Sequence, residues 1–494
     1  MTTTAIERPK PIFSPLVLGL FLIAIGLMAW VTQEDIHIPT SVLLAIIGGS
    51  SLAIFVTGLM QPEIPLLALA AYLPFSRLLI GGFSGFATAV NFTNVLMIIV
   101  IVGHVFQSLA QHRPLFERSA MNVPTFLFCV LGSISLIRGM TAGYGADYAA
   151  MFIIPLKRWL TPVVLYFLTF NIVRDRLMVR RLVVIMMIVV TVAALMAFKE
   201  YIDIGPNSSL DSSRVGGIAE QPNMLGAFFV YYMFLFAGFW ILRWKKAAYW
   251  LLLIPFALCF RGIMVTFSRG AYLAFAVGAL ALAFFRSKLL CLAAIAFCVL
   301  AVVNPSILPS GMAYRLEMTL RPPKPDYVDA GTNLTEQLDA SSANRLKIWG
   351  GAMRMIQDHP LGGVGYGAFP HLIQYYEPET RLIDTHNSYL LIATEMGIPA
   401  LLVFLWIVVI MLWKSRWLYR HAADPFFKAM ALGWLAGLYG LLIANLFGSR
   451  LFSEEVSSYF WMLCGLVMRA IVIERNAQQP RARHRTALRR VRTA

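Results

Sequence analysis

The sequence predicts an all-helical protein that crosses a membrane many times. Hydrophobic residues make up 59% of the 494 residues, and charged residues make up only 13%. A soluble domain carries roughly 25% charged residues. Apolar runs of close to 20 residues, the length that crosses a bilayer as a helix, recur along the whole chain. This composition excludes a soluble enzyme, a disordered chain and a nucleic-acid-binding domain.

The apolar runs predict about 12–14 transmembrane helices. Fourteen runs qualify, and the fifth and eleventh are the weakest. They are 13–32, 40–60, 64–80, 91–110, 123–137, 152–173, 181–200, 223–242, 247–266, 268–285, 289–303, 387–413, 428–447 and 454–472.

The basic residues predict the orientation of these helices. Lys and Arg gather in every second loop, for example at 174–181, 243–246 and 286–288. Loops rich in basic residues stay on the cytoplasmic side. Both termini are therefore expected in the cytoplasm, and the long polar loop 304–386 outside. The net charge of +16 reflects this orientation and contact with anionic membrane lipid, and we expect no nucleic-acid partner.

The chain is expected to have four parts. These are an N-terminal transmembrane bundle, a large periplasmic loop, C-terminal transmembrane helices and a basic cytoplasmic tail, at 1–303, 304–386, 387–474 and 475–494. The tail holds seven arginines and no acidic residue. We expect it to be disordered and held on the anionic inner leaflet.

The outer loop is too long to be a simple connection and is predicted to be partly helical. Apolar residues at a spacing of three to four predict a helix over 342–357. A proline and four glycines then break the chain over 358–367, and a second short helix is expected at 369–376.

Basic residues on the outer side of the membrane are candidates for binding phosphate. Because guanidinium stays charged and forks onto two oxygens, a group of arginines beside an apolar surface suits a lipid-linked phosphate. The alternative for each residue is a structural role, either reaching to the membrane surface or pairing with a carboxylate. The candidates are Lys157, Arg158, Arg214, Arg269 and Arg345.

His386 is the strongest candidate for a catalytic group. It follows the outer loop directly and precedes a long apolar helix. With Asp384 or Thr385 as the N-cap, His386 falls in the first turn, where the helix dipole disfavours a charged imidazole. A neutral imidazole can act as general base. The alternative is a capping or interfacial histidine. Asn387 and Tyr389 are candidate supporting residues.

The sequence indicates no metal site and no cofactor. It contains no pair of ligands at the spacing that metal motifs use, and all five cysteines lie in apolar runs, which is typical of packing residues. The helix that follows the outer loop 304–386 contains Pro399, which is expected to kink it.

Five short segments together resemble one known family. They are Ser268–Gly270, Arg345 to Trp349, His359–Gly365, His386–Tyr389 and Glu395–Gly397. In this order and spacing they are similar to the O-antigen ligase / O-antigen polymerase superfamily of bacterial envelope glycosyltransferases.

The resemblance covers about residues 210–410 and implies a function. Such proteins take a glycan from an undecaprenyl-pyrophosphate carrier at the outer face of the bacterial inner membrane. A ligase passes the glycan to a lipid A core sugar. The implied fold is a helical bundle with a large periplasmic loop, like that of metal-independent C-type glycosyltransferases. By the same resemblance His386 is the general base, Arg269 and Arg345 bind the pyrophosphate, and Arg214 is a further basic position.

The acceptor stays open at this point. A polymerase would use a second lipid-linked glycan, and a protein O-glycan ligase would use a protein hydroxyl. A solute transporter is the alternative of a different class, but its charges should lie near the middle of the membrane. Since no pair of carboxylates stands ready as nucleophile, we expect a single displacement that inverts the anomeric carbon.

Overall fold

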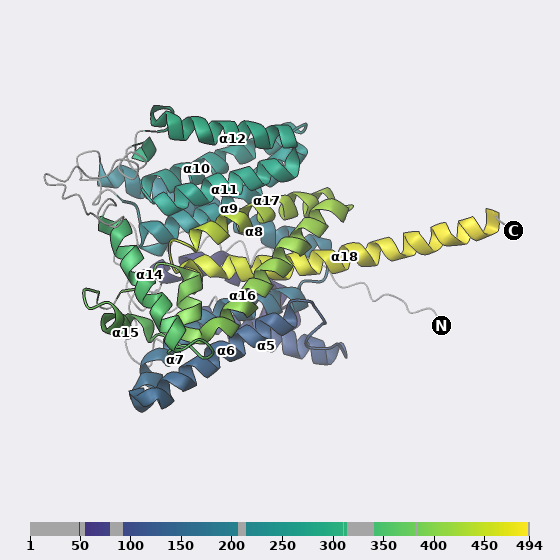
Figure 1. The fold of residues 1–494 in the computed structure, drawn as a ribbon. Helices are drawn as coiled ribbons and strands as arrows, with labels where there is room; N and C mark the ends of the chain where they lie inside the picture. The colour runs from purple at the N-terminus through teal and green to yellow at the C-terminus, as the bar shows by residue number, and fades with distance from the viewer. Residues whose placement is uncertain are drawn as a thin grey trace. The chain divides into compact units, whose positions relative to one another are not determined.

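The protein is helical throughout the part that a computed structural model describes. The described residues are 49, 55–79, 92–205, 214–309, 311–313, 340–380 and 383–492. Every regular element in these ranges is a helix, so the predicted fold class is confirmed (Figure 1). Ten of the helices are long and apolar enough to cross a membrane.

These ten helices correspond to ten of the fourteen predicted spans. They are α5 (Phe92–Ala110), α6 (Asn122–Gly139), α7 (Gly145–Ile172), α8 (Arg176–Ile204), α9 (Pro222–Arg243), α10 (Leu253–Val265, which a 3₁₀ turn at Ala247–Leu252 precedes), α11 (Arg269–Arg286), α16 (Ser388–His421), α17 (Pro425–Ala444) and α18 (Glu454–Arg492).

The remaining four predicted spans have different outcomes. Two correspond to shorter apolar helices, Glu63–Phe75, which begins with α3 (Glu63–Tyr72), and α12 (Lys288–Val303). The run 13–32 lies outside the described residues, as does most of 40–60.

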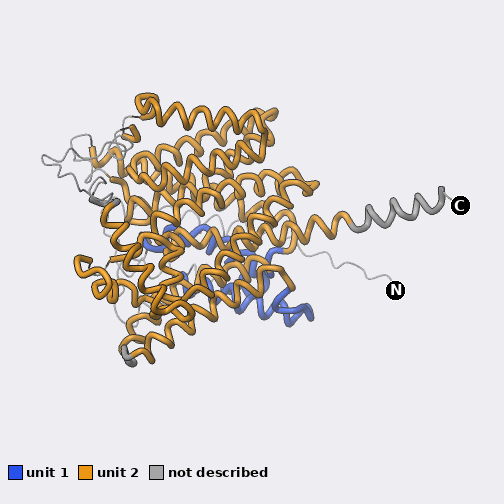
Figure 2. The backbone as a smooth tube through the Cα atoms, viewed as in Figure 1, with its two compact units in different colours: residues 1–117, 171–173 blue, residues 118–170, 174–494 orange. Residues whose placement is uncertain are grey.

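Two compact units divide the chain (Figure 2). The smaller unit comprises residues 1–117 and 171–173, and in it α3 packs against α5, with Tyr72 and Phe92 edge to face at 4.9 Å. The larger unit comprises residues 118–170 and 174–494. All residues discussed below belong to the larger unit.

A buried aromatic cluster joins three helices of the larger unit. Tyr232 of α9 stacks on Trp434 of α17 and meets Tyr459 of α18 edge to face. Its hydroxyl donates a hydrogen bond to Val456 O at 2.5 Å. This bond satisfies the buried hydroxyl of Tyr232 within the packed rings.

The N-terminal end of α17 is held by ion pairs. Asp424 caps α17 by accepting from Phe426 N–H, and it also pairs with Arg180 of α8 at 2.9 Å. Arg176, one turn earlier on α8, pairs with Glu474 of α18 at 3.1 Å. Arg176, Arg180, Asp424 and Glu474 are called the ion-paired end below.

The basic tail is helical where it is described. The last span continues without a break, and α18 ends only at Arg492. The expectation of disorder is therefore wrong for residues 475–492. A helix that starts inside a packed bundle avoids the cost of nucleation, so its polar extension can continue the same hydrogen-bond ladder.

The predicted kink in α16 is present, but it lies at Gly397 rather than Pro399. Gly397 has φ 86° and ψ 166°, values open to glycine because it lacks a Cβ. Pro399 has no N–H to continue the helix. The backbone groups that are left without partners in the helix bond instead to residues 358–367, called the glycine-rich loop below. Ile398 N–H donates to Pro360 O at 2.8 Å, and Val364 N–H donates to Thr394 O at 2.8 Å.

Candidate functional site

The two helices of the long polar loop pack on the start of α16. They are α14 (Ala340–Asp358) and α15 (Phe369–Tyr376), close to the predicted 342–357 and identical to the predicted 369–376. Figure 1 shows both helices at the end of α16 where it begins. Their apolar faces form one buried cluster of Ile348, Ala352, Met355, Phe369, Ile373 and Leu391. This packing fixes α14 against the residues that precede α16.

Glu395 of α16 contacts the start of α15, directly after the glycine-rich loop. It is 4% exposed, and its carboxylate accepts from the backbone N–H of Phe369 at 3.4 Å, at the first residue of α15. A carboxyl oxygen at a helix N-terminus is favourable because it accepts from N–H groups that have no partner within the helix. Glu395 therefore joins α16 to the start of α15.

Trp349 places Arg345 beside the histidine. The indole Nε1 donates to Thr385 O at 3.0 Å, so α14 is joined to the residue directly before His386. Arg345 lies four residues before Trp349, and residues at this spacing share one face of a helix. The Arg345 guanidinium consequently acts electrostatically on the His386 imidazole.

The position of His386 differs from the prediction. Asn387 is the N-cap of α16, and its side chain accepts from the N–H groups of Tyr389 and Leu390. His386 therefore lies outside the helix, and the expectation that it falls in the first turn after Asp384 or Thr385 is wrong. Its φ of 51° is left-handed, which is rare for a residue with a Cβ.

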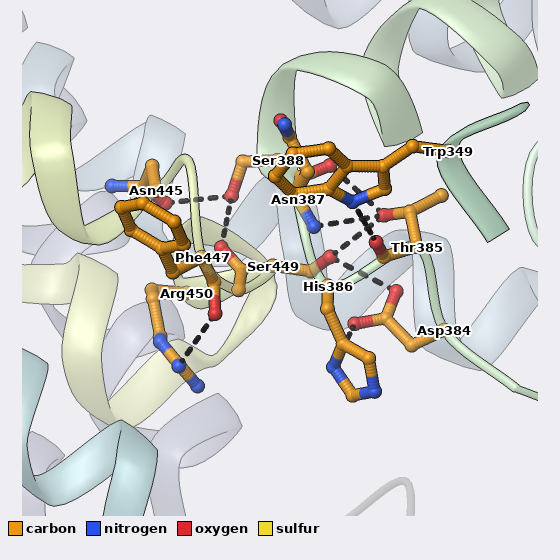
Figure 3. Close-up of polar contacts among 11 residues, drawn as sticks. Trp349, Asp384, Thr385, His386, Asn387, Ser388, Asn445, Phe447, Ser449 and Arg450 are labelled. Atoms are coloured by element: carbon orange, nitrogen blue, oxygen red, sulfur yellow. Dashed lines mark hydrogen bonds and ion pairs between the residues drawn. The ribbon is translucent and has the colours of Figure 1, made fainter. Parts of the chain in front are cut away.

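A short segment between α17 and α18 holds the turn around His386 (Figure 3). Ser388 Oγ donates to Asn445 Oδ1 at 2.6 Å and to Gly448 O at 3.1 Å. Ser449 Oγ donates to Asp384 Oδ1 at 2.9 Å. Residues 445–450 are called the clamp segment below. It brings the last two spans into the candidate site.

The clamp segment also contributes Arg450, which the sequence analysis missed. Arg450 is 6% exposed, and its guanidinium donates to Phe447 O at 3.1 Å. The side chain folds back over Gly448, where a Cβ would lie 2.2 Å from the guanidinium carbon. Arg345, Asp384 and Arg214 all act on its charge. A basic residue in the short connection 448–453 between the last two predicted spans was the signal that could have found it.

Arg214, which precedes α9, and Arg269 meet at the neighbouring turn between α10 and α11. Arg214 donates to Thr266 O at 3.0 Å and to Asn223 Oδ1 at 3.0 Å. Arg269 is the first residue of α11, and a Cβ on the following Gly270 would lie 3.0 Å from Phe447 of the clamp segment. This turn therefore contacts the segment that holds Arg450.

The electrostatics keep the histidine neutral. Burial lowers the pKa of the His386 imidazole below its ordinary value, Arg345 and Arg450 lower it further, and Asp384 opposes them. Burial also lowers the pKa of the Arg450 guanidinium to about 10, and the nearby cations add to this. Since 10 is far above neutral pH, Arg450 stays charged beside a neutral imidazole.

Three of the four predicted supporting residues contact other parts of the fold, and these are Lys157, Arg158 and Tyr389. Lys157 and Arg158 of α7 act on Glu454 at the start of α18. The Tyr389 hydroxyl donates to Leu442 O at 2.9 Å, so it joins α16 to α17. Asn387 alone of the supporting candidates directly shapes the turn at His386. Among the described residues, no group of three His, Cys, Asp or Glu side chains could hold a metal ion.

The fold and the site together define a multi-pass membrane protein with a histidine and several arginines where its spans meet α14 and α15. Residues 254–405 match the model of a family described as O-antigen ligase. This region of the chain is therefore an O-antigen ligase domain, and the resemblance inferred from the motifs is confirmed. The family comprises transferases and ligases of lipid-linked glycans. None of the curated proteins compared matches the chain.

The matched region includes Arg269, Arg345 and His386 and ends before the clamp segment. Arg214 and Arg450 lie outside it on either side. The site described above therefore extends beyond the part of the chain that the family model covers.

Proposed function

We propose that this protein transfers a glycan from undecaprenyl pyrophosphate to a hydroxyl of an acceptor, a lipid A core sugar, at the periplasmic face of the inner membrane. The observation that carries the proposal is His386 in the turn before α16, with Arg345 and Arg450 acting on its imidazole, within or beside the O-antigen ligase domain. The orientation follows from the basic loops, which leave both termini in the cytoplasm.

The arginines serve the leaving group. As the bond between the anomeric carbon and the phosphate oxygen breaks, its electron pair passes to the pyrophosphate. Fixed cations stabilise this charge without reorganisation, and one preorganised contact of this kind contributes about 2.7–4 kcal/mol in comparable oxyanion sites. We assign this role to Arg214, Arg269, Arg345 and Arg450.

His386 serves the attacking group. The acceptor hydroxyl gives its proton to the imidazole, and its oxygen forms the new bond to the anomeric carbon. Because the attack and the departure occur on opposite sides of that carbon, the configuration inverts. The products are the glycosylated acceptor, undecaprenyl pyrophosphate and a protonated histidine, which then returns its proton to water.

The test uses the purified protein and its His386→Ala variant. Each is incubated with a polyprenyl-pyrophosphate-linked glycan and either a lipid A core or a second carrier-linked glycan, and carrier release and product size are measured. We expect one glycan on the lipid A core, lost in the variant by a factor of about 10²–10⁴. A ladder on the carrier would instead identify a polymerase, and retained configuration would contradict the single displacement.

A further inference from the structure

The turn at His386 is held in an unfavourable backbone conformation by three separate contacts. Thr385 is fully buried, its carbonyl accepts from Trp349, and its hydroxyl donates to Asn387 O at 2.9 Å. The same hydroxyl lies 3.2 Å from Ser449 Oγ. Left-handed φ in a residue with a Cβ persists only where the surroundings enforce it, and such residues gather at functional sites.

The consequence of this turn is that the two residues flanking Thr385 come together. Asp384 Oδ2 and His386 Nδ1 are 3.8 Å apart, and each side chain is 40% exposed. Figure 3 shows the carboxylate and the imidazole beside each other, with the Arg450 guanidinium extending in the same direction. A hydrogen bond between these two atoms requires them to approach to about 2.7–3.2 Å.

The Asp384 carboxylate is held by the clamp segment, which lies between α17 and α18. Ser449 of the clamp segment donates to Asp384 Oδ1, which leaves Oδ2 to face the imidazole. The charged groups that act on the imidazole are two cations, Arg345 from α14 and Arg450 after α17, and one anion, Asp384. Asp384 therefore supplies the negative charge that an imidazolium at this place requires.

We propose that Asp384 is the positioning carboxylate of His386. It accepts a hydrogen bond from Nδ1–H, so that Nε2 is the nitrogen that takes the proton from the acceptor hydroxyl. The proton stays on Nε2 in the imidazolium, and Asp384 remains ionised and offsets the new positive charge. The identity of the acceptor in this inference rests on the proposed function. The pairing of Asp384 with His386 does not rest on it.

A residue-specific titration tests the pairing without any turnover. Diethyl pyrocarbonate modifies neutral imidazole, so the pH dependence of modification at His386, measured by mass spectrometry of the full chain, reports its pKa. Since Asp384 raises that pKa, the midpoint should move to lower pH in Asp384→Asn. It should stay in place in Asp384→Glu, which keeps the charge. His359 and His371 serve as internal controls.

The transfer assay tests the catalytic consequence. Asp384→Asn should lower kcat about 10–100-fold, part of the 10²–10⁴ that a general base contributes, with little change in the KM of the donor. The acidic limb of its pH profile should move to lower pH together with the titration midpoint. Glu379→Gln is the matched control, because Glu379 is an exposed loop carboxylate that pairs with Lys347.

The outcomes separate the two proposals. An unchanged His386 midpoint in Asp384→Asn overturns the pairing, whatever the activity. A moved midpoint with unchanged kcat also overturns the positioning role. If the wild-type protein transfers no glycan to any acceptor, the proposed function fails, while the midpoint still decides the pairing. Recovery of activity in Asp384→Glu supports the inference, and equal loss in Glu379→Gln contradicts it.

Discussion

The two ends of α17 hold arginines in opposite electrostatic settings. At its N-terminal end Arg180 pairs with the buried carboxylate of Asp424, and Arg180 itself is half exposed. Past its C-terminal end Arg450 is buried, bonds to a backbone carbonyl and faces further arginines. One arginine is neutralised within the fold, and the other carries a charge that a ligand can neutralise. The two arginines therefore differ both in burial and in the partner that each one has.

Among changes at the two ends of α17, the largest effect on transfer is expected from Arg450→Gln. Removing one cation from the leaving-group site should lower kcat/KM about 10²–10³-fold. The melting temperature should not fall, because the change also removes like-charge repulsion from Arg345 and Arg214. The matched control is Arg180→Gln at the ion-paired end, which should leave transfer unchanged. Equal kcat/KM in the two variants would contradict the comparison.

A smaller effect is expected from Gly448→Ala, which keeps every charge. The new Cβ would lie 2.2 Å from the Arg450 guanidinium carbon, so the flexible side chain must move. A misplacement of about 1 Å lowers rates by up to about 10²-fold. Transfer kinetics should therefore show a loss of about 10–100-fold in a normally folded protein. Wild-type kinetics would mean that the position of Arg450 is unimportant.

The pH dependence of glycan transfer should come from His386 and not from the ion-paired end. Because burial lowers the pKa of His386 below its ordinary value, the base is free at neutral pH and is lost as the pH falls through that pKa. We expect kcat/KM to be flat near pH 7 and to fall about tenfold per pH unit below the pKa. The same profile in Asp424→Asn would show that the ion-paired end does not contribute. An acidic limb that begins above pH 7 would exclude a neutral His386 as the base.

The smallest effect on transfer, with the clearest effect on stability, is expected from Asp424→Ala. This variant loses both the N-cap of α17 and the pair with Arg180. The loss of an N-cap costs about 0.5–2 kcal/mol, and a half-exposed ion pair adds about 1 kcal/mol or less. Thermal unfolding in detergent should show the decrease, while kcat/KM stays within about twofold of wild type. A large kinetic loss would mean that the two ends are coupled.

The sequence could predict the helices better than the contacts between them. Hydrophobic runs of membrane length determine the spans, and the glycines after Asp358 determine where α14 ends, so both were found. The N-cap of α16 was wrong because Asp384, Thr385 and Asn387 all have capping side chains. Packing decides among them, since Trp349 and Ser449 hold Thr385 inside the turn.

The candidate site was predicted only in part for the same reason. His386, Arg269 and Arg345 stand in recognisable motifs. Arg450 joins them through the clamp segment, which reaches the histidine turn by side-chain hydrogen bonds from Ser388 and Ser449. These contacts link residues about 60 positions apart. A pattern of hydrophobicity along the chain contains no information on such pairings.

The break in α16 at Gly397 limits how this chain can be recombined with relatives. The glycine-rich loop closes the break with backbone hydrogen bonds, from Val364 to Thr394 and from Ile398 to Pro360. A chimaera that exchanges residues 340–386 alone separates a loop from the half-helix whose shape it completes. A chimaera that exchanges residues 340–398 moves the loop together with the first part of α16, so both hydrogen bonds keep their two partners. In this protein the unit that evolution or an engineer can move as one piece therefore ends inside a membrane span.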